Sequence, residues 1–112
     1  MLDETVYVMN DEGEVLSIDV LRAPLQPSIK GVTDKRRYII INEYLDDLRD
    51  MGISDPELMV KIHELYHVIH PKDGEYQTRK NADDEYGSIT GEEVDTAGEY
   101  EKWIEGMNNK FN

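Results

Sequence analysis

Apolar and polar residues alternate along two stretches near the start of the chain. Residues 5–9 (TVYVM) and 14–20 (EVLSIDV) show this period of two and are rich in β-branched side chains, as half-buried strands are. The four residues between them, NDEG, are typical of a turn, so the pattern predicts a β-hairpin. Short apolar runs predict two more strands, at residues 28–33 (SIKGVT) and 37–42 (RYIIIN).

The middle of the chain changes to a helical pattern. Residues 43–50 (EYLDDLRD) predict a short helix that ends before Gly52. Ser54 then precedes Glu57 by three residues, which is the spacing of a capping box at the start of a helix. This second helix is predicted to run through LMVKIHELYHVIH and to end at Pro71.

The last third of the chain is polar. Residues 71–91 have no apolar period and contain several glycines and charged residues, so we predict a loop there. A last helix is predicted from about Glu92 to Met107. Because we find no internal repeat and no second domain, residues 1–112 are predicted to form one compact α+β domain, with a short antiparallel sheet packed on the central helix.

Composition narrows the class of protein. The 112 residues are 38% hydrophobic and 33% charged, which is ordinary for a soluble domain. No apolar run reaches the roughly 18 residues of a membrane span, and the N-terminus lacks the pattern of a signal peptide. There is no cysteine for a disulfide or a thiolate metal site. We therefore expect a cytoplasmic protein that does not enter a membrane.

The charge balance bears on the class of partner. The 25 acidic residues outnumber the 12 basic ones and give a net charge of −13. An acidic surface repels nucleic acid and anionic lipid, and it attracts basic partners. We therefore expect no direct binding to nucleic acid, while the oligomeric state stays open.

The most specific chemical signal is HELYH, at residues 63–67. Residues four apart share one face of a helix, so His63 and His67 can bind one metal ion. Glu64 then stands where the general base of a metalloprotease takes a proton from a zinc-activated water. Zinc suits such a site because it has no redox chemistry and accepts an open fourth position. The competing interpretation is a helix that carries these side chains without a metal.

A zinc site of this kind needs a third protein ligand, and several positions compete for it. His70 stands about 10 Å along the helix axis from His63, too far for both to bind one ion while the helix is unbroken. Asp73 lies ten residues after His63, as in the metzincin pattern, but that pattern has glycine where this chain has His70. Glu93 shares an otherwise apolar face of the last predicted helix, where a buried carboxylate requires a cation. Glu93 is the predicted third ligand, with Asp73 and Glu92 as alternatives.

Three stretches of the sequence resemble the ImmA/IrrE family of small zinc metallopeptidases. Residues 29–32 (IKGV), followed by residues 38–42 (YIIIN), are similar to the family's glycine-containing strand and to the strand before its active-site helix. HELYH matches the HELxH core of the family. Residues 93–98 (EVDTAG) resemble the downstream segment whose glutamate is the third zinc ligand. The resemblance covers roughly residues 28–105.

The resemblance implies a minimal zincin-like fold, in which a short sheet packs beside the metal helix and the C-terminal helix carries the third ligand. It implies that His63, His67 and Glu93 bind Zn²⁺ and that Glu64 is the general base. The implied activity is that of a zinc metalloendopeptidase acting on a specific intracellular protein, typically a helix-turn-helix repressor of a phage or mobile element. A basic DNA-binding repressor would also suit the net charge of −13.

Two other hypotheses differ in class from a peptidase. In the first, the protein is a metal-bound anti-repressor that sequesters its partner without hydrolysis. In the second, it is an acidic DNA mimic, which gives no reason for HELYH. One residue departs from the family pattern at the site itself, because Tyr66 stands where the family usually has glycine. Tyr66 is expected either to narrow the cleft or to offer its hydroxyl to an oxyanion.

Overall fold

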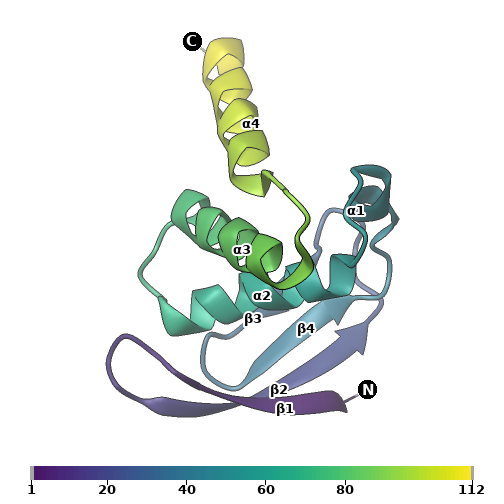
Figure 1. The fold of residues 1–112 in the computed structure, drawn as a ribbon. Coiled ribbons are helices and arrows are strands. Elements are labelled where there is room, and N and C mark those ends of the chain that lie inside the picture. The colour runs from purple at the N-terminus through teal and green to yellow at the C-terminus, as the bar shows by residue number, and fades with distance from the viewer. Residues whose placement is uncertain (1, 112) are drawn as a thin grey trace.

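Four strands precede four helices in the computed structural model, which describes the backbone of residues 2–111 and the side chains of residues 4–108 (Figure 1). The strands are β1 (Leu2–Met9), β2 (Val15–Ala23), β3 (Gly31–Thr33) and β4 (Tyr38–Asn42). The helices are α1 (Asp46–Asp50), α2 (Pro56–Ile69), α3 (Glu75–Thr90) and α4 (Thr96–Phe111).

The sheet contains the predicted hairpin but is mixed rather than antiparallel. β1 and β2 pair antiparallel, and the buried Asn10 holds their turn because its Oδ1 accepts hydrogen bonds from the backbone N–H groups of Glu12 and Glu14. The strand order is β1-β2-β4-β3. β4 pairs antiparallel with β3 and parallel with β2, so the prediction of an antiparallel sheet was wrong for the β2–β4 pair. After β2 the chain crosses to the far edge to form β3, and β4 returns between them.

Asn42 fixes the segment that makes this crossover. Asn42 is buried, with 1% of the residue exposed. Its Oδ1 accepts hydrogen bonds from the backbone N–H groups of Leu25 and Tyr44. Its Nδ2 donates to the carbonyl oxygens of Gln26 and Ile29. The amide of Asn42 therefore supplies hydrogen bonds to backbone groups that have no partner in a helix or a sheet. These bonds fix the segment between β2 and β3, so that β3 lies at the edge of the sheet and beside α2.

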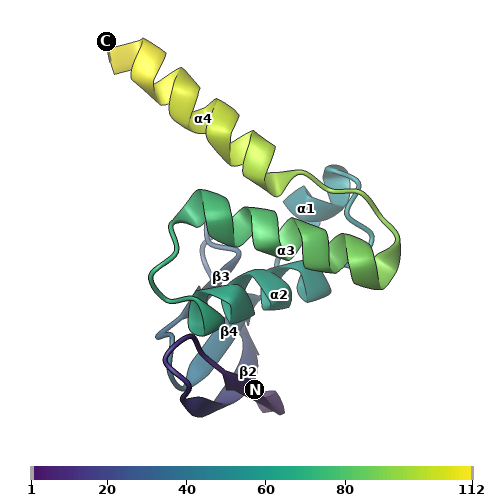
Figure 2. The ribbon, with the colours of Figure 1, turned by 60° about the vertical axis from the view of Figure 1, so that its left-hand side comes forward.

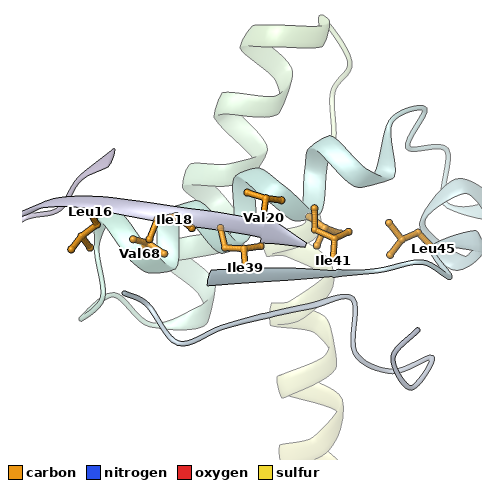
Figure 3. Packing of buried hydrophobic residues seen from close by; sticks show 8 residues of the cluster. Leu16, Ile18, Val20, Ile39, Ile41, Leu45 and Val68 are labelled. Atoms are coloured by element: carbon orange, nitrogen blue, oxygen red, sulfur yellow. The ribbon is translucent and has the colours of Figure 1, made fainter. Parts of the chain in front are cut away.

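The helices are stacked outward from one face of the sheet. α2 packs against β3 and β4, and α3 packs on α2 (Figures 1 and 2). Between the sheet and α2 lies an aliphatic core in which alternate residues of β2 take part, as the period of two predicted (Figure 3). Its members are Leu16, Ile18, Val20, Ile39, Ile41, Leu45, Val60 and Val68. A second cluster joins α2 to α3 and consists of Ile53, Met59, Ile62, Ala82 and Tyr86.

The helix that carries HELYH is confirmed, although its cap differs from the prediction by one residue. The N-cap is Asp55, whose side chain accepts a hydrogen bond from the backbone N–H of Leu58. Ser54 instead donates from its hydroxyl and its backbone N–H to the carboxylate of Glu92. α2 ends with His70 as its C-cap, directly before the proline that was expected to stop it.

Residues 75–90 form helix α3, so the prediction of a loop over residues 71–91 was wrong for most of its length. Its buried positions are Thr78, Ala82, Asp83 and Tyr86, which follow a helical spacing but include only two apolar side chains. An apolar period was therefore too weak to detect. The helix ends at Gly91, which has a φ of +76° and caps it in the left-handed conformation.

α4 begins at Thr96, later than the predicted start at Glu92, and it leads away from the rest of the molecule (Figures 1 and 2). It contacts α3, and Asp83 of α3 anchors its first turn by accepting hydrogen bonds from the Thr96 hydroxyl and the Ala97 backbone N–H. Further along, Trp103 is 57% exposed. Between residues 2 and 111, no helix has the length and apolar character needed to cross a membrane.

Candidate metal centre

The first turn of α3 brings a carboxylate to the two histidines of HELYH. His63 and His67 lie one turn apart on α2, with ring centroids 4.9 Å apart. Glu75 places Oε1 3.0 Å from His63 Nε2 and Oε2 3.2 Å from His67 Nε2. One ligand atom from each residue lies within 4.8 Å of the others, so the three residues form a group that can hold a metal ion.

One nitrogen atom of each histidine in this group is buried without a hydrogen bond to any residue that the structure describes. His63 Nε2 is buried and has no hydrogen-bond partner among the described residues, although a Glu75 oxygen lies close to it. His67 Nδ1 is likewise buried without a partner. Buried polar atoms without partners cost free energy, and a bound cation would remove part of that cost. Two imidazoles and one carboxylate are also a donor set that Zn²⁺ takes in hydrolases.

Glu75 is held in place from its own helix. Arg79, one turn later, donates from Nε to Glu75 Oε1 over 2.9 Å and from Nη1 to the carbonyl oxygen of Thr96 over 3.2 Å. Burial alone would raise the pKa of Glu75, but the two histidines and Arg79 outweigh burial and hold this pKa well below its usual range. Glu75 is therefore a carboxylate at neutral pH, ready to bind a cation.

Glu64 lies beside the group and is buried, with 5% of the residue exposed. Its Oε1 is 3.6 Å from His63 Nδ1. Burial raises the pKa of the Glu64 carboxyl, the charges of His63, His67 and Lys35 lower it, and Glu75 adds to the rise. A carboxyl with a raised pKa holds a proton more readily than an exposed one, which is what a proton-transfer group requires.

A glycine lets β3 approach α2 at this point. A Cβ on Gly31 would lie 2.7 Å from Cγ1 of Val60 and 3.1 Å from Cγ of Glu64. Any side chain at position 31 would therefore push the strand away from the helix. Between β3 and α2 lies a cavity of about 500 Å³ whose lining includes His63, Glu64, His67 and Glu75. A cavity of this size can admit a short peptide segment.

The structure does not bring Glu93 to the histidines. Glu93 is exposed in the connection between α3 and α4 and borders a separate hollow with Asp83 and Asp84. Because α4 begins at Thr96, the helical spacing that directed Glu93 inward does not apply to it. The carboxylate that joins the group is Glu75, on α3 and not on the C-terminal helix.

Glu92 and Asp73, which competed with Glu93 for the place of third ligand, lie apart from the two histidines of HELYH. Glu92 accepts hydrogen bonds from Ser54 and from the hydroxyl of Tyr86. Asp73 donates its backbone N–H to the carbonyl of His70 in the turn after α2. Neither residue belongs to the metal-binding group among the described residues.

Tyr66 and His70 lie outside the cavity. Tyr66 packs with the cluster between α2 and α3, and its ring stacks on that of His70 at a centroid distance of 5.9 Å. Nδ1 of His70 lies 2.6 Å from Oδ1 of Asp11 and ties the end of α2 to the hairpin turn. Neither expectation for Tyr66, a narrower cleft or a hydroxyl for an oxyanion, is supported by this position.

Glu75 was missed because its segment was predicted to be a loop. One local signal was present, since Glu75 and Arg79 have the i,i+4 spacing and the order that stabilise a helix. An acidic residue directly after Gly74 also suits the first turn of a helix.

The chain matches no protein-family model, no curated protein and no solved structure.

Proposed function

We propose that this protein is a zinc-dependent peptidase, with His63, His67 and Glu75 as the metal ligands and Glu64 as the general base. The observation that carries the proposal is the meeting of three metal-binding side chains and a buried glutamate in one cavity. Glu64 lies beside the metal-binding group, and its side chain approaches Gly31 of β3. A buried carboxylate with a perturbed pKa in a cavity is a candidate for a functional group.

The residues would divide the chemistry between them. Zn²⁺ held by His63, His67 and Glu75 would supply a Lewis acid toward a water molecule and a peptide carbonyl. Glu64 would take a proton from the attacking water on a carboxylate oxygen. It would then pass this proton to the nitrogen of the leaving amine as the C–N bond breaks. Only 5% of Glu64 is exposed, and this burial raises the pKa of its carboxyl.

The resemblance to the ImmA/IrrE family supports a protein substrate, and a helix-turn-helix repressor remains our proposed one. The support comes from HELYH and from the two strands that precede it, because β3 and β4 lie next to α2 as the resemblance implies. The segment at residues 93–98 contributes no support, because the carboxylate near the two histidines belongs to Glu75 and not to Glu93.

The proposal is tested with Glu64→Gln, which keeps the size of the side chain but cannot accept the proton. Wild type and Glu64→Gln should both retain zinc in elemental analysis, whereas only wild type should cleave candidate repressors or casein. A Glu64→Gln protein that still cuts would rule out the mechanism. If both proteins capture a repressor equally and neither cuts it, the protein is the non-hydrolytic anti-repressor instead.

A further inference from the structure

The cavity has a direction, because β3 and α2 run alongside each other. Gly31, at the start of β3, lies against Val60 and Glu64. Lys35, in the turn after β3, reaches the end of α2, where its Nζ donates to the carbonyl oxygen of Pro71 over 3.1 Å. The metal-binding group therefore lies between two ends of the cavity.

The two ends differ in chemistry. Toward the start of α2 the lining contains the apolar side chains of Ile29, Met59 and Val60. Ser28 and Lys30, which pairs with Asp47, lie at the same end. Toward the end of α2 the lining includes Lys35, whose ammonium group bonds to the Pro71 carbonyl. Met59 and His67 are eight residues apart, which is about 12 Å along a helix axis, or the length of a few extended peptide residues.

Lys35 is the cation in this cavity that lacks a carboxylate partner. Among the described residues, Lys30 pairs with Asp47 at 3.0 Å and Arg79 pairs with Glu75 at 2.9 Å. Lys35 has only the Pro71 carbonyl. An ammonium group has three N–H donors, so two donors remain for another group, although the charge of Lys35 also acts on Glu64.

The backbone holds Lys35 in this position. Its φ is +66°, a left-handed conformation that a residue with a side chain rarely adopts. The Thr33 hydroxyl oxygen accepts its backbone N–H, and the carboxylate of Asp34 accepts the backbone N–H groups of Arg36 and Arg37 just after it. Such a conformation costs free energy and persists where surrounding contacts maintain it, often at binding sites.

We propose that Lys35 binds a carboxylate of the substrate, so that the site selects peptides with a carboxylate on one side of the cut bond and an apolar side chain on the other. The carboxylate can be an Asp or Glu side chain or the C-terminal carboxyl group of the peptide. Such a cation matters on a protein of net charge −13, because most of the surface repels a carboxylate. A basic DNA-binding protein meets the requirement with a single acidic residue next to the cut.

This inference rests on the proposed peptidase function, and binding tests it without turnover. The probes are fluorescein-labelled, C-terminally amidated hexapeptides with one Leu and one Glu at scanned positions, and the same peptides with Gln. A third set has Gln and a free C-terminal carboxyl group. Binding is measured by fluorescence polarisation to zinc-loaded Glu64→Gln at near-physiological salt, alone and combined with Lys35→Met. Lys80→Met, which removes an exposed lysine of α3, is the matched control for charge.

We expect peptides with a carboxylate to bind about tenfold or more tightly than their Gln partners, because hydrogen bonds to charged groups are the stronger ones. Lys35→Met should abolish this preference, and Lys80→Met should retain it. The Glu set and the free-carboxyl set tell which source the site takes. An unchanged preference in Lys35→Met, or no preference in any set, overturns the inference.

A further outcome separates Lys35 from the chemistry itself. If Lys35→Met in the otherwise wild-type protein lowers kcat equally for Glu and Gln peptides, Lys35 serves the reacting carbonyl and the inference is overturned. The peptidase proposal is judged apart from this result, by bound zinc and by the loss of cleavage in Glu64→Gln. Elemental analysis of Lys35→Met should still find the wild-type zinc content.

Discussion

Glu75 touches both histidines of α2, one with each carboxylate oxygen. Glu75→Gln keeps the shape of the side chain but removes its charge. We expect zinc affinity to fall by more than the roughly 10–100-fold that loss of an outer hydrogen-bond partner causes, because a direct ligand is removed. Competition with a chelator measures the affinity. Glu93→Gln is the matched control and should bind zinc like wild type; the opposite result would return Glu93 to the site.

Gly31 is a second residue whose change has a defined cost. In Gly31→Ala the new methyl group would lie 2.7 Å from Cγ1 of Val60, a buried β-branched side chain whose χ1 is restricted in a helix. We expect a loss of about 1–3 kcal/mol in the free energy of unfolding, as for other overpacked sites. Urea denaturation measures it. Gly106→Ala in α4 is the control, since nothing lies within 4 Å of that position. Equal stability of the two variants would mean that β3 does not press on α2.

At the scale of elements, the β3–β4 turn depends on one carboxylate. Burial acts to raise the pKa of Asp34, but hydrogen bonds from the backbone N–H groups of Arg37, Arg36 and Tyr38 and from the Arg37 side chain hold it well below 3.8, its ordinary value. A depressed pKa means that the ionised group stabilises the folded state. This stability is present above the unfolded pKa and is lost as the pH falls through the folded one.

The corresponding prediction compares wild type with Asp34→Asn across pH. The difference in free energy of unfolding should be largest at neutral pH and should shrink as the pH falls below about 4, where the unfolded chain takes up the proton. Chemical denaturation at several pH values measures the difference. A constant or growing difference toward acid pH would show that the ionised carboxylate does not stabilise the turn.

α3 shows what a sequence pattern can and cannot predict about an element. The hairpin and α2 were predictable because their buried faces are apolar at regular intervals. α3 buries Thr78 and Asp83 beside Ala82 and Tyr86, and the polar pair is satisfied by Gly74, Thr96 and Ala97. Gly74 is the N-cap of α3 itself, but the partners of Asp83 belong to α4. The sequence pattern therefore could not predict that this helix is buried. Glu75 was missed because it belongs to the same helix.

The path of the sheet has a similar explanation. The strand patterns placed all four strands within a few residues, but the mixed order depends on the segment that Asn42 holds after β2. A polar residue that bonds to irregular backbone has no periodic signature. Two members of the candidate metal-binding group, His63 and His67, were predictable from spacing alone, because both belong to one helix. The third needed the packing of α3 on α2.

At the scale of the whole molecule, the net charge of −13 opposes folding through self-repulsion. Raising NaCl from about 10 mM to about 200 mM shortens the screening length from about 30 Å to less than 10 Å. The melting temperature should therefore rise by a few degrees at neutral pH in metal-free buffer. Surface ion pairs such as Arg36–Glu14 weaken with salt, so a falling melting temperature would mean that these pairs outweigh the repulsion.

The direction of α4 decides what the intrinsic fluorescence of this protein can report. Its single tryptophan, Trp103, lies 57% exposed on the helix that leads away from the cavity and the cores. Its emission is therefore that of a solvated indole in the native state, and it changes little when the sheet unfolds. Zinc binding at His63, His67 and Glu75 should leave the spectrum unchanged, whereas any molecule that covers α4 should shift the emission to shorter wavelength.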